Sequence, residues 1–417
     1  MSETVRVEKL VHGGQGIGSL VDGRKVFVWN ALPGELVSVR IIKRKHSYAE
    51  AVAEDIIEVS PERIDPKESN YLSTSPWQIM SFEAENRFKK EVVTELFNQF
   101  DVTIPKFIMT TKGKEWHYRN KMEYSFWGDD QGLHLALHNR GSHQKQIVSG
   151  SELAMTYIDE GAQAILLELQ KSNVRAGDLK TIIVRSNQTG DVVVSLFVKD
   201  ENLIKLTLPV NIKGLRVYYS NPKSPASVAT KLLYELGDKK IQDRLLGQLF
   251  TYDVDSFFQV NLPIFEEVIK TIKRYSHDRD LVDMYAGVGS IGLSVASKKV
   301  ELVEIEEHTA EMARVNAMAS HLEADVVKAS AEESLDYIQE SKSIIFDPPR
   351  AGLHNKVVER VLNVKPPQII YLSCNPATQA RDLSKLQDVY RVDYFEAFNF
   401  FPRTPHIETL AILSKNT

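Results

Sequence analysis

LVDMYAGVGSIGLSVASKK, residues 281–299, is the stretch that decides the fold of the last third of this 417-residue chain. Its apolar start, up to Gly287, is typical of a buried strand, and the glycine-rich turn that follows opens a helical pattern. From here onward, strand patterns alternate with helix patterns along the chain. This alternation predicts an α/β domain with a doubly wound, Rossmann-like sheet of parallel strands.

Three glycines in the turn, Gly287, Gly289 and Gly292, fit the pattern G-x-G-x-x-G. Such a loop lets the backbone approach a ligand at a helix N-terminus, and Glu304 at the end of the next strand is placed to hold ribose hydroxyls. The arrangement suits a dinucleotide about as well as S-adenosylmethionine, because both present an adenosine ribose. The loop alone therefore leaves both cofactors open.

Two further strand patterns end in residues with useful chemistry. In KSIIFDPPRAGL (342–353), Asp347 precedes two prolines, which cannot continue the hydrogen bonding of a strand. In QIIYLSCNPATQARDL (368–383), Cys374 follows an apolar run. Ligands bind at the carboxyl ends of parallel strands in open α/β sheets, so we expect Glu304, Asp347 and Cys374 to face one crevice.

Cys374 is the single cysteine of the chain. Asn375 is a good N-cap and Pro376 a good first helical residue, so a helix N-terminus should lie beside the sulfur and favour the reactive thiolate. The alternative is a small buried hydrophobic residue. A hydride-transfer enzyme has no evident use for this thiol, whereas an enzyme that transfers a methyl group to an unreactive carbon can use it.

The composition is that of an ordinary globular protein, with 43% hydrophobic residues and a length that suits about two or three domains. No apolar run approaches the roughly 20 residues of a membrane helix, and MSETVRVEKL lacks the build of a signal peptide. We therefore expect a cytoplasmic protein without membrane contact. A single cysteine excludes a disulfide framework and a multi-thiolate metal site.

The first part of the chain, residues 3–58, alternates short β-rich runs with turns and predicts a small OB-like barrel of five strands. The glycines of GGQGIG (13–18) are expected to form its turns or bends, because a strand follows them. A basic run in this region suits nucleic acid and equally suits a solvated edge strand. It consists of Arg40, Lys43, Arg44 and Lys45, with Trp29 and Tyr48 nearby.

A polar, proline-containing linker near residues 59–70 precedes a region that mixes helix and strand patterns. It begins with the helical pattern FEAENRFKKEVVTELFNQF (82–100) and includes a hairpin through NQTG (187–190). A second basic and aromatic cluster is of the sort that contacts single-stranded RNA, against a solvated strand face as the alternative. Its members are Lys112, Lys114, Trp116, Tyr118, Arg119 and Lys121.

Six motifs follow one another in an order that resembles the RNA 5-methyluridine methyltransferases, which act on tRNA or 23S ribosomal RNA. They are SFFQVN, DMYAGVGSIGL, VEIE, DPPRAG, SCNPATQARDL and TPHIET. The resemblance covers nearly the whole chain. It implies a TRAM barrel over residues 1–60, a central α+β RNA-binding domain over 70–250 and an S-adenosylmethionine-dependent methyltransferase domain over 251–417.

The resemblance also implies a mechanism. Cys374 matches the nucleophile that adds to carbon 6 of uracil, and Glu408 matches the base that removes the proton from carbon 5 after methyl transfer. Four more residues match the cofactor and uracil pocket: Gln259, Tyr285, Glu304 and Asp347. The alternatives without a catalytic or binding role are a surface or strand-end carboxylate for Glu408, a helix-capping amide for Gln259 and a packed core ring for Tyr285.

The chain departs from the family in two places. Many members hold an iron–sulfur cluster through four cysteines, but the corresponding segments 66–82 and 149–154 contain none. We expect no iron–sulfur cluster, and a central domain held by packing alone. Ser330 stands where an acidic residue is frequent, which leaves the adenine side of the pocket open.

Three residues near the motifs have open roles. Arg350 and Arg381 are either phosphate contacts or partners of nearby carboxylates, and His406 is given no chemistry beyond shaping a turn. Arg350 directly follows the Asp-Pro-Pro motif, where related cytosine methyltransferases carry a cysteine nearby, and this favours uracil as the target.

The sequence thus predicts an enzyme that methylates carbon 5 of a uridine in structured RNA, with 23S ribosomal RNA favoured over tRNA. The target base is expected to be flipped out or to lie in a loop. The alternatives are an NAD(P)-dependent oxidoreductase built on the glycine loop and a non-catalytic RNA-binding protein. The sequence carries no sign of oligomeric state, and a monomer is our working expectation.

Overall fold

The structure is a computed structural model that describes residues 3–142, 144–202, 205–224, 226–276 and 280–416. Residues 1–2, 143, 203–204, 225, 277–279 and 417, which fall within the predicted domain ranges, lie outside this description. The chain divides into two compact units. The N-terminal unit comprises Met1–Ala84, Lys114–Ile241 and Asp253–Asp255, and the C-terminal unit comprises Glu85–Gly113, Gln242–Tyr252 and Ser256–Thr417.

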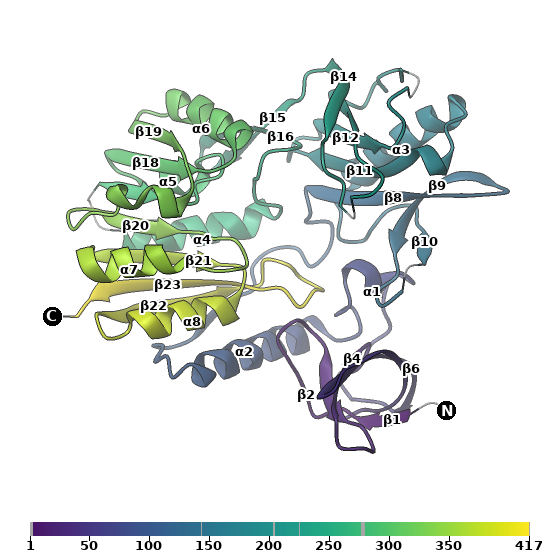
Figure 1. The fold of residues 1–417 in the computed structure, drawn as a ribbon, viewed down its shortest axis with the longest axis horizontal. Helices are drawn as coiled ribbons and strands as arrows, with labels where there is room; N and C mark the ends of the chain where they lie inside the picture. Colours follow the sequence, from purple (N-terminus) through teal and green to yellow (C-terminus); the bar gives the residue numbers. More distant parts are fainter. Residues whose placement is uncertain (1–2, 143, 203–204, 225, 277–279, 417) are drawn as a thin grey trace. The chain divides into compact units, whose positions relative to one another are not determined.

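The first part of the N-terminal unit is a six-stranded sheet that curls into a barrel (Figure 1), one strand more than predicted because the first run breaks into β1 and β2. Gly16 and Gly18 lie where strands cross closely, since a Cβ there would meet a Val7 methyl at 2.6 Å and the Arg6 carbonyl at 2.4 Å. The strands are β1 (Glu3–Arg6), β2 (Lys9–Leu10), β3 (Gly16–Ser19), β4 (Lys25–Trp29), β5 (Leu36–Arg44) and β6 (Tyr48–Glu58).

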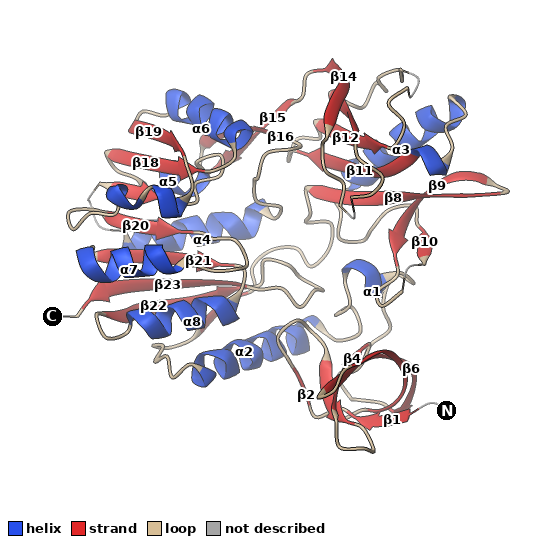
Figure 2. Cartoon of the chain, viewed as in Figure 1, coloured by secondary structure: helices blue, strands red, loops and turns tan. Residues whose placement is uncertain are grey.

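The second part of the N-terminal unit is a seven-stranded sheet packed against helix α3 (Thr156–Lys171), with one apolar core between them (Figure 2). The predicted hairpin through 187–190 joins β11 to β12. In sheet order, the strands are β10 (Lys145–Ile147), β9 (Gly132–His138), β8 (Lys121–Asp129), β11 (Leu179–Ser186), β12 (Val192–Val198), β13 (Gly214–Tyr219) and β14 (Lys231–Gly237).

The two segments without cysteines are joined by a hydrogen-bond network around Glu68, which precedes the short helix α1 (Tyr71–Thr74). Glu68 Oε1 accepts from the backbone N–H of Glu152 at 2.7 Å, and Oε2 accepts from Gln78 Nε2 at 2.7 Å and Ser75 Oγ at 3.4 Å. Gln78 is 1% exposed and accepts in turn from the backbone of Lys67 at 2.9 Å. The expectation of packing alone was therefore wrong, because polar groups join these segments.

The C-terminal unit is built on an eight-stranded mixed sheet with helices on both faces (Figure 2). In sheet order, the strands are β19 (Glu323–Lys328), β18 (Lys299–Glu304), β17 (Leu281–Asp283), β20 (Ser343–Phe346), β21 (Gln368–Ser373), β23 (Glu408–Lys415), β22 (Tyr390–Phe398) and β7 (Ile108–Thr110). The five strands from β19 to β21 run parallel, whereas β23 is antiparallel to both its neighbours. The predicted doubly wound α/β fold is confirmed, with an antiparallel addition at one side.

The helices of this unit follow the strands in the order expected for a doubly wound sheet. They are α4 (Leu262–Tyr275), α5 (Ser290–Val295), α6 (Glu307–Ala319), α7 (Asn355–Val364) and α8 (Pro376–Leu386). None of the described helices has the length and apolar character needed to cross a membrane.

Helix α2 (Phe82–Gln99) and strand β7 differ from the predicted domain division, which placed them in the central domain. Phe97 of α2 lies 4.7 Å, ring centroid to ring centroid, from Phe395 of β22, and Val93 belongs to the same core. β7 pairs with the outer edge of β22. An amphipathic pattern shows that a helix has a buried face but not which sheet covers it, so the sequence could not place this segment.

We predict that Glu68→Ala lowers the free energy of unfolding by about 1–3 kcal/mol, because it leaves the Glu152 N–H and the Gln78 amide without their acceptor. Urea denaturation followed by circular dichroism measures this. Glu160→Ala is the matched control, since Glu160 is an exposed carboxylate on α3 of the same unit. Equal midpoints for the two variants would contradict a structural role for Glu68.

Candidate active site

The glycine-rich loop after β17 is held by a buried carboxylate. Asp283 Oδ2 accepts from the backbone N–H of Gly292 at 3.0 Å, and Oδ1 accepts from that of Tyr285 at 3.4 Å. Gly287 and Gly289 have φ values of +57° and +85°, a region that L side chains rarely adopt. A Cβ on Gly292 would meet Leu302 Cδ2 at 2.6 Å, so the third glycine lets α5 pack on β18.

Glu304, the predicted ribose ligand, lies at the end of β18 beside this loop. Its Oε2 accepts from the backbone N–H of Gly287 at 2.9 Å, and its Oε1 accepts from that of Glu306 at 2.8 Å. The carboxylate therefore fixes the loop first. Each of its oxygens has two lone pairs, so one acceptor position per oxygen remains for a ligand.

Gln259 and Tyr285 flank the same loop. Gln259 is 8% exposed and lies two residues after Phe257, whose ring and carbonyl would both be 3.6 Å from a Cβ on Gly287. The ring of Tyr285 is 6.5 Å from that of Phe346, at the end of β20. Tyr285 thus lies at the start of the glycine-rich loop and packs on the core, and Gln259 follows a residue, Phe257, that lies beside this loop.

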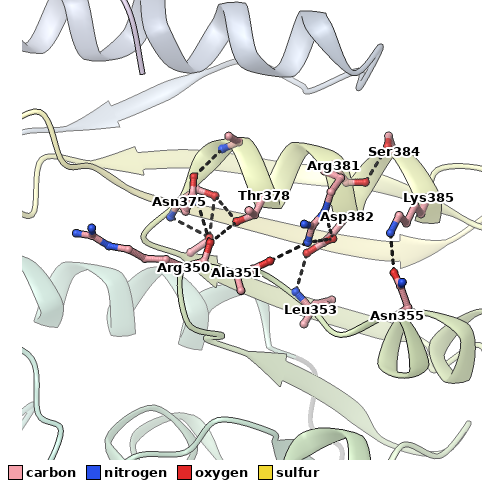
Figure 3. Close-up of polar contacts among 12 residues, drawn as sticks. Arg350, Ala351, Leu353, Asn355, Asn375, Thr378, Arg381, Asp382, Ser384 and Lys385 are labelled. Carbon is pink, nitrogen blue, oxygen red and sulfur yellow. Dashed lines mark hydrogen bonds and ion pairs between the residues drawn. The ribbon is translucent and has the colours of Figure 1, made fainter. Parts of the chain in front are cut away.

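The loops after β20 and β21 are joined by the hydrogen bonds of Figure 3. The carbonyl of Arg350 accepts from Asn375 Nδ2 at 2.8 Å and from Thr378 Oγ1 at 3.3 Å. One turn further along α8, the buried carboxylate of Asp382 accepts from the backbone N–H of Leu353 at 2.8 Å. The chain after Asp347 is thereby held against the turn that carries Cys374.

Cys374 lies between β21 and α8, as predicted, with Asn375 as the N-cap and Pro376 in the first turn. β21 and β23 are antiparallel, and their last pair is Ser373 opposite Thr409, so that Cys374 directly follows Ser373 and Glu408 directly precedes Thr409. Glu408 lies close enough to Cys374 to raise its pKa. The register therefore brings the predicted nucleophile and the predicted base together.

Side chains lock this register at the end of the sheet. Thr409 Oγ1 donates to the carbonyl of Ser373 at 3.3 Å, and Gln379 Nε2 donates to the carbonyls of Tyr371 and Thr409 at 2.8 and 3.1 Å. Glu408 itself is 4% exposed, and its Oε2 has no hydrogen-bond partner among the described residues. A buried acceptor left open in this way is expected at a functional site rather than in a core.

Burial and like charge raise the pKa values of the acidic groups in this pocket. Burial raises the pKa of Glu408 well above its usual range, nearby Asp347 raises it further, and Arg350 opposes them. Burial raises the pKa of Asp347 as well, with a second contribution from Asp283. At neutral pH, these carboxyl groups therefore retain protons.

The prediction that Cys374 is a thiolate is wrong for the site without substrate. Burial, followed by Glu408 and Asp347, raises the pKa of Cys374 to about 12, against a smaller opposing effect of Arg350. The N-terminus of α8 does not offset these effects. Cys374 is therefore a half-buried thiol that keeps its proton at neutral pH.

The chain matches the models of two known families. Residues 81–416 match the model of the tRNA (uracil-5-)-methyltransferase family, and residues 3–53 match that of the TRAM domain. The chain belongs to the tRNA (uracil-5-)-methyltransferase family. It is accordingly an enzyme, and the resemblance seen in its motifs is confirmed.

Proteins of other organisms match this chain over nearly its whole length. A protein of Lactobacillus johnsonii named as an uncharacterized RNA methyltransferase is 30% identical over 99% of this chain and 98% of its own. One of Caldanaerobacter subterraneus with the same description is 29% identical over 99% and 98%. The crystal structure of a Pyrococcus abyssi tRNA (uracil-54, C5)-methyltransferase with S-adenosyl-L-homocysteine has a TM-score of 0.80, 24% identity, and coverage of 98% of this chain and 99% of that one. This last match shows a shared fold.

Arg350 and Arg381, whose roles the sequence left open, differ in their contacts. Arg381 forms an ion pair with Asp382 at 2.7 Å and donates to the carbonyl of Ala351, so it is a carboxylate partner. The guanidinium of Arg350 extends away from this network (Figure 3), is exposed, and forms no ion pair with any described residue. His406 lies in the turn before Glu408, with its ring edge against Phe401.

Ser330, by contrast, has a structural role. It caps a short 3₁₀ turn in a capping box with Glu333, whose Oε2 accepts from Ser330 Oγ at 2.9 Å. Sequence reasoning missed Asp283 and Asp382. Asp283 ends an apolar strand pattern, where burial demands hydrogen-bond donors, whereas Asp382 lies in a mixed helical stretch that gives no such signal.

We predict that the alkylation of Cys374 by iodoacetamide accelerates about tenfold per pH unit up to pH 10. A thiol with a pKa of about 12 is thiolate in roughly one molecule in 3,000 at pH 8.5, where an ordinary cysteine is half ionised. The rate is measured by mass spectrometry of the single thiol, with glutathione as the control. A plateau near pH 8.5 would show that the pKa is not raised. Glu408→Gln removes an ionisable group that raises the pKa of Cys374 and should increase the rate.

Proposed function

We propose that the chain forms 5-methyluridine in a structured RNA, through a transient bond between Cys374 and carbon 6 of uracil. The observation that carries this proposal is the buried, unpartnered carboxylate of Glu408 opposite a thiol at the carboxyl edge of the sheet. A nucleophile and a base on adjacent strands are what addition to a pyrimidine, followed by elimination, requires. Family membership sets the oxidoreductase and the non-catalytic alternatives aside.

The residues beside the glycine loop fit S-adenosylmethionine. Among the described residues, only Phe257 would lie within 4 Å of a Cβ on Gly287, so there is open space beside this backbone. Glu304 keeps acceptor positions for the ribose hydroxyls. Gln259 and Tyr285 complete the proposed cofactor set. When bound, S-adenosylmethionine supplies an electrophilic methyl group.

Carbon 5 of uracil is a poor nucleophile until a sulfur adds at carbon 6. As the sulfur–carbon bond forms, the thiol proton of Cys374 passes to solvent, to which the half-buried sulfur is partly exposed, and the ring electrons move onto the oxygen at carbon 4. Asp347 and Glu408 retain their protons at this stage and place no negative charge beside the sulfur. The electron-rich carbon 5 is then able to accept a methyl group.

Glu408 acts in the second half of the reaction. Glu408 first releases its resting proton to solvent. Its carboxylate then removes the proton from carbon 5, the ring double bond re-forms, the bond to Cys374 breaks, and the departing sulfur takes up a proton from solvent. Asp347, kept protonated by burial, donates a hydrogen bond to the oxygen that gains charge in the adduct. The two carboxyl groups therefore divide the roles of base and hydrogen-bond donor.

Arg350, rather than the barrel, is the part of the chain that we propose contacts the RNA. Three members of the barrel's basic run pair with glutamates: Arg40 with Glu54 at 2.7 Å, Lys43 with Glu50 at 3.9 Å, and Arg44 with Glu3. The free guanidinium of Arg350 lies close enough to Cys374 and Glu408 to lower their pKa values. We propose that it binds a phosphate next to the flipped uridine.

The sequence favoured 23S ribosomal RNA because of the barrel. The Pyrococcus abyssi protein shares the fold over its full length and is named for uracil 54 of tRNA. A barrel-bearing fold is thus compatible with either RNA, and we propose tRNA and 23S ribosomal RNA as equal candidates. Mapping 5-methyluridine in total RNA of a deletion strain distinguishes them by the site that disappears.

We predict that the enzyme forms a denaturation-resistant complex with RNA that contains 5-fluorouridine, because fluorine at carbon 5 cannot be removed by Glu408. Cys374→Ala should abolish the complex. Gel electrophoresis under denaturing conditions measures it. A complex that persists without the sulfur would refute the covalent route.

We further predict that Arg350→Ala weakens RNA binding and reduces the slope of log affinity against log salt by about one. Filter binding between 50 and 300 mM salt measures the slope. Arg314→Ala is the control, because Arg314 is paired with Glu307 on α6. Identical slopes for wild type and Arg350→Ala would argue against a phosphate contact.

A further inference from the structure

The loop of residues 399–407, which connects β22 to β23, leads directly into Glu408. Its first half lies against a buried ion pair, Glu85 and Lys89, at the start of α2. All these groups belong to the C-terminal unit. Glu85 is 0% and Lys89 1% exposed, so two charges are fully withdrawn from water beside this loop.

Lys89 Nζ has all three of its donor positions occupied. It donates to Glu85 Oε1 at 2.8 Å, to Asn399 Oδ1 at 2.6 Å and to the backbone carbonyl of Phe401 at 3.1 Å. Two of these three acceptors belong to the loop. The lysine therefore holds the loop by both a side chain and the main chain.

Glu85 accepts hydrogen bonds from the same loop. It accepts from Asn399 Nδ2 at 2.9 Å and from the backbone N–H of Arg403 at 3.0 Å. Arg403 has a φ of +65°, which is strained for a side chain with a Cβ, and its guanidinium lies 4.0 Å from Glu85. A backbone in this conformation persists only where surrounding contacts determine it.

The loop is also connected to the cofactor side of the site. Asn261, two residues after Gln259, donates from Nδ2 to the carbonyl of Phe400 at 2.9 Å. Thr404 Oγ1 donates to the carbonyl of Phe401 at 2.8 Å and closes the turn that precedes His406. The position of Glu408 is thus set from two directions: by the β21 register on one side and by this loop on the other.

A buried ion pair is weak evidence for stability, because desolvation opposes the attraction of the charges. Its partners here are loop groups rather than core groups, so its evident effect is on geometry. We propose that Glu85 and Lys89 are positioning residues that hold the 399–407 loop so that the Glu408 carboxylate reaches the proton on carbon 5. This inference rests on the proposed role of Glu408 as the base.

The test compares Lys89→Met with Glu408→Gln and with a matched control, Lys342→Met. Lys342 forms another buried ion pair in the same unit, at 2.6 Å from Glu301, but it precedes β20 at the opposite end of the strands. Each variant is incubated with RNA from a strain lacking the modification and with methyl-labelled S-adenosylmethionine. Product release and the label trapped in a denaturation-resistant protein–RNA adduct are measured separately.

Glu408→Gln should accumulate labelled adduct, because methyl transfer precedes removal of the proton. Lys89→Met should do the same and lower turnover by about 10²-fold, the size of effect that a 1 Å misplacement produces. Lys342→Met should accumulate no adduct. Glu85→Gln, which keeps one acceptor oxygen, should show the same defect in weaker form, and it serves as the test if Lys89→Met does not fold.

Two failures are distinguishable. If Glu408→Gln accumulates no labelled adduct, the proposed role of Glu408 is wrong. If Glu408→Gln accumulates it but Lys89→Met and Glu85→Gln show normal turnover, or lose adduct and product in equal proportion, the positioning role is wrong and the proposed function stands.

Discussion

The antiparallel register of β21 and β23 is the constraint on which the site depends. With Ser373 opposite Thr409, the next residues outward are a thiol and a carboxyl group from segments 34 residues apart. Shifting the register by one residue would turn each side chain to the other face of the sheet. The hydrogen bonds that Thr409 and Gln379 donate across this pair therefore fix the positions of Cys374 and Glu408 as well as the register of the sheet.

The same closeness explains the protonation of the pocket. A thiol and two carboxyl groups share a poorly solvated space, and each negative charge disfavours the next. At rest, the thiol and the two carboxyl groups therefore keep their protons. Arg350 opposes the rise in the pKa values of Cys374 and Glu408, and its guanidinium extends away from the hydrogen bonds of Figure 3.

The sequence was informative where chemistry and local structure coincide. The strand, turn and helix around Cys374 follow from an apolar run, an N-cap and a proline, and the glycine loop follows from its spacing. The affiliation of α2 was not predictable, because its apolar face carries no information about which sheet covers it. The Cys374 thiol was misjudged for a related reason: a helix N-terminus is visible in a sequence, but burial and opposing carboxylates appear only when the fold is known. Glu85 and Lys89 were overlooked because their partners lie more than 300 residues away.

The hydrogen-bond network around Glu68 has a consequence for how this part of the chain is completed. The Glu68 carboxylate, which also accepts from the Gln78 amide, joins residues 66–82 to residues 149–154 with groups of the chain itself. Every partner in this junction is already present in the polypeptide, so the junction closes as soon as the two segments meet.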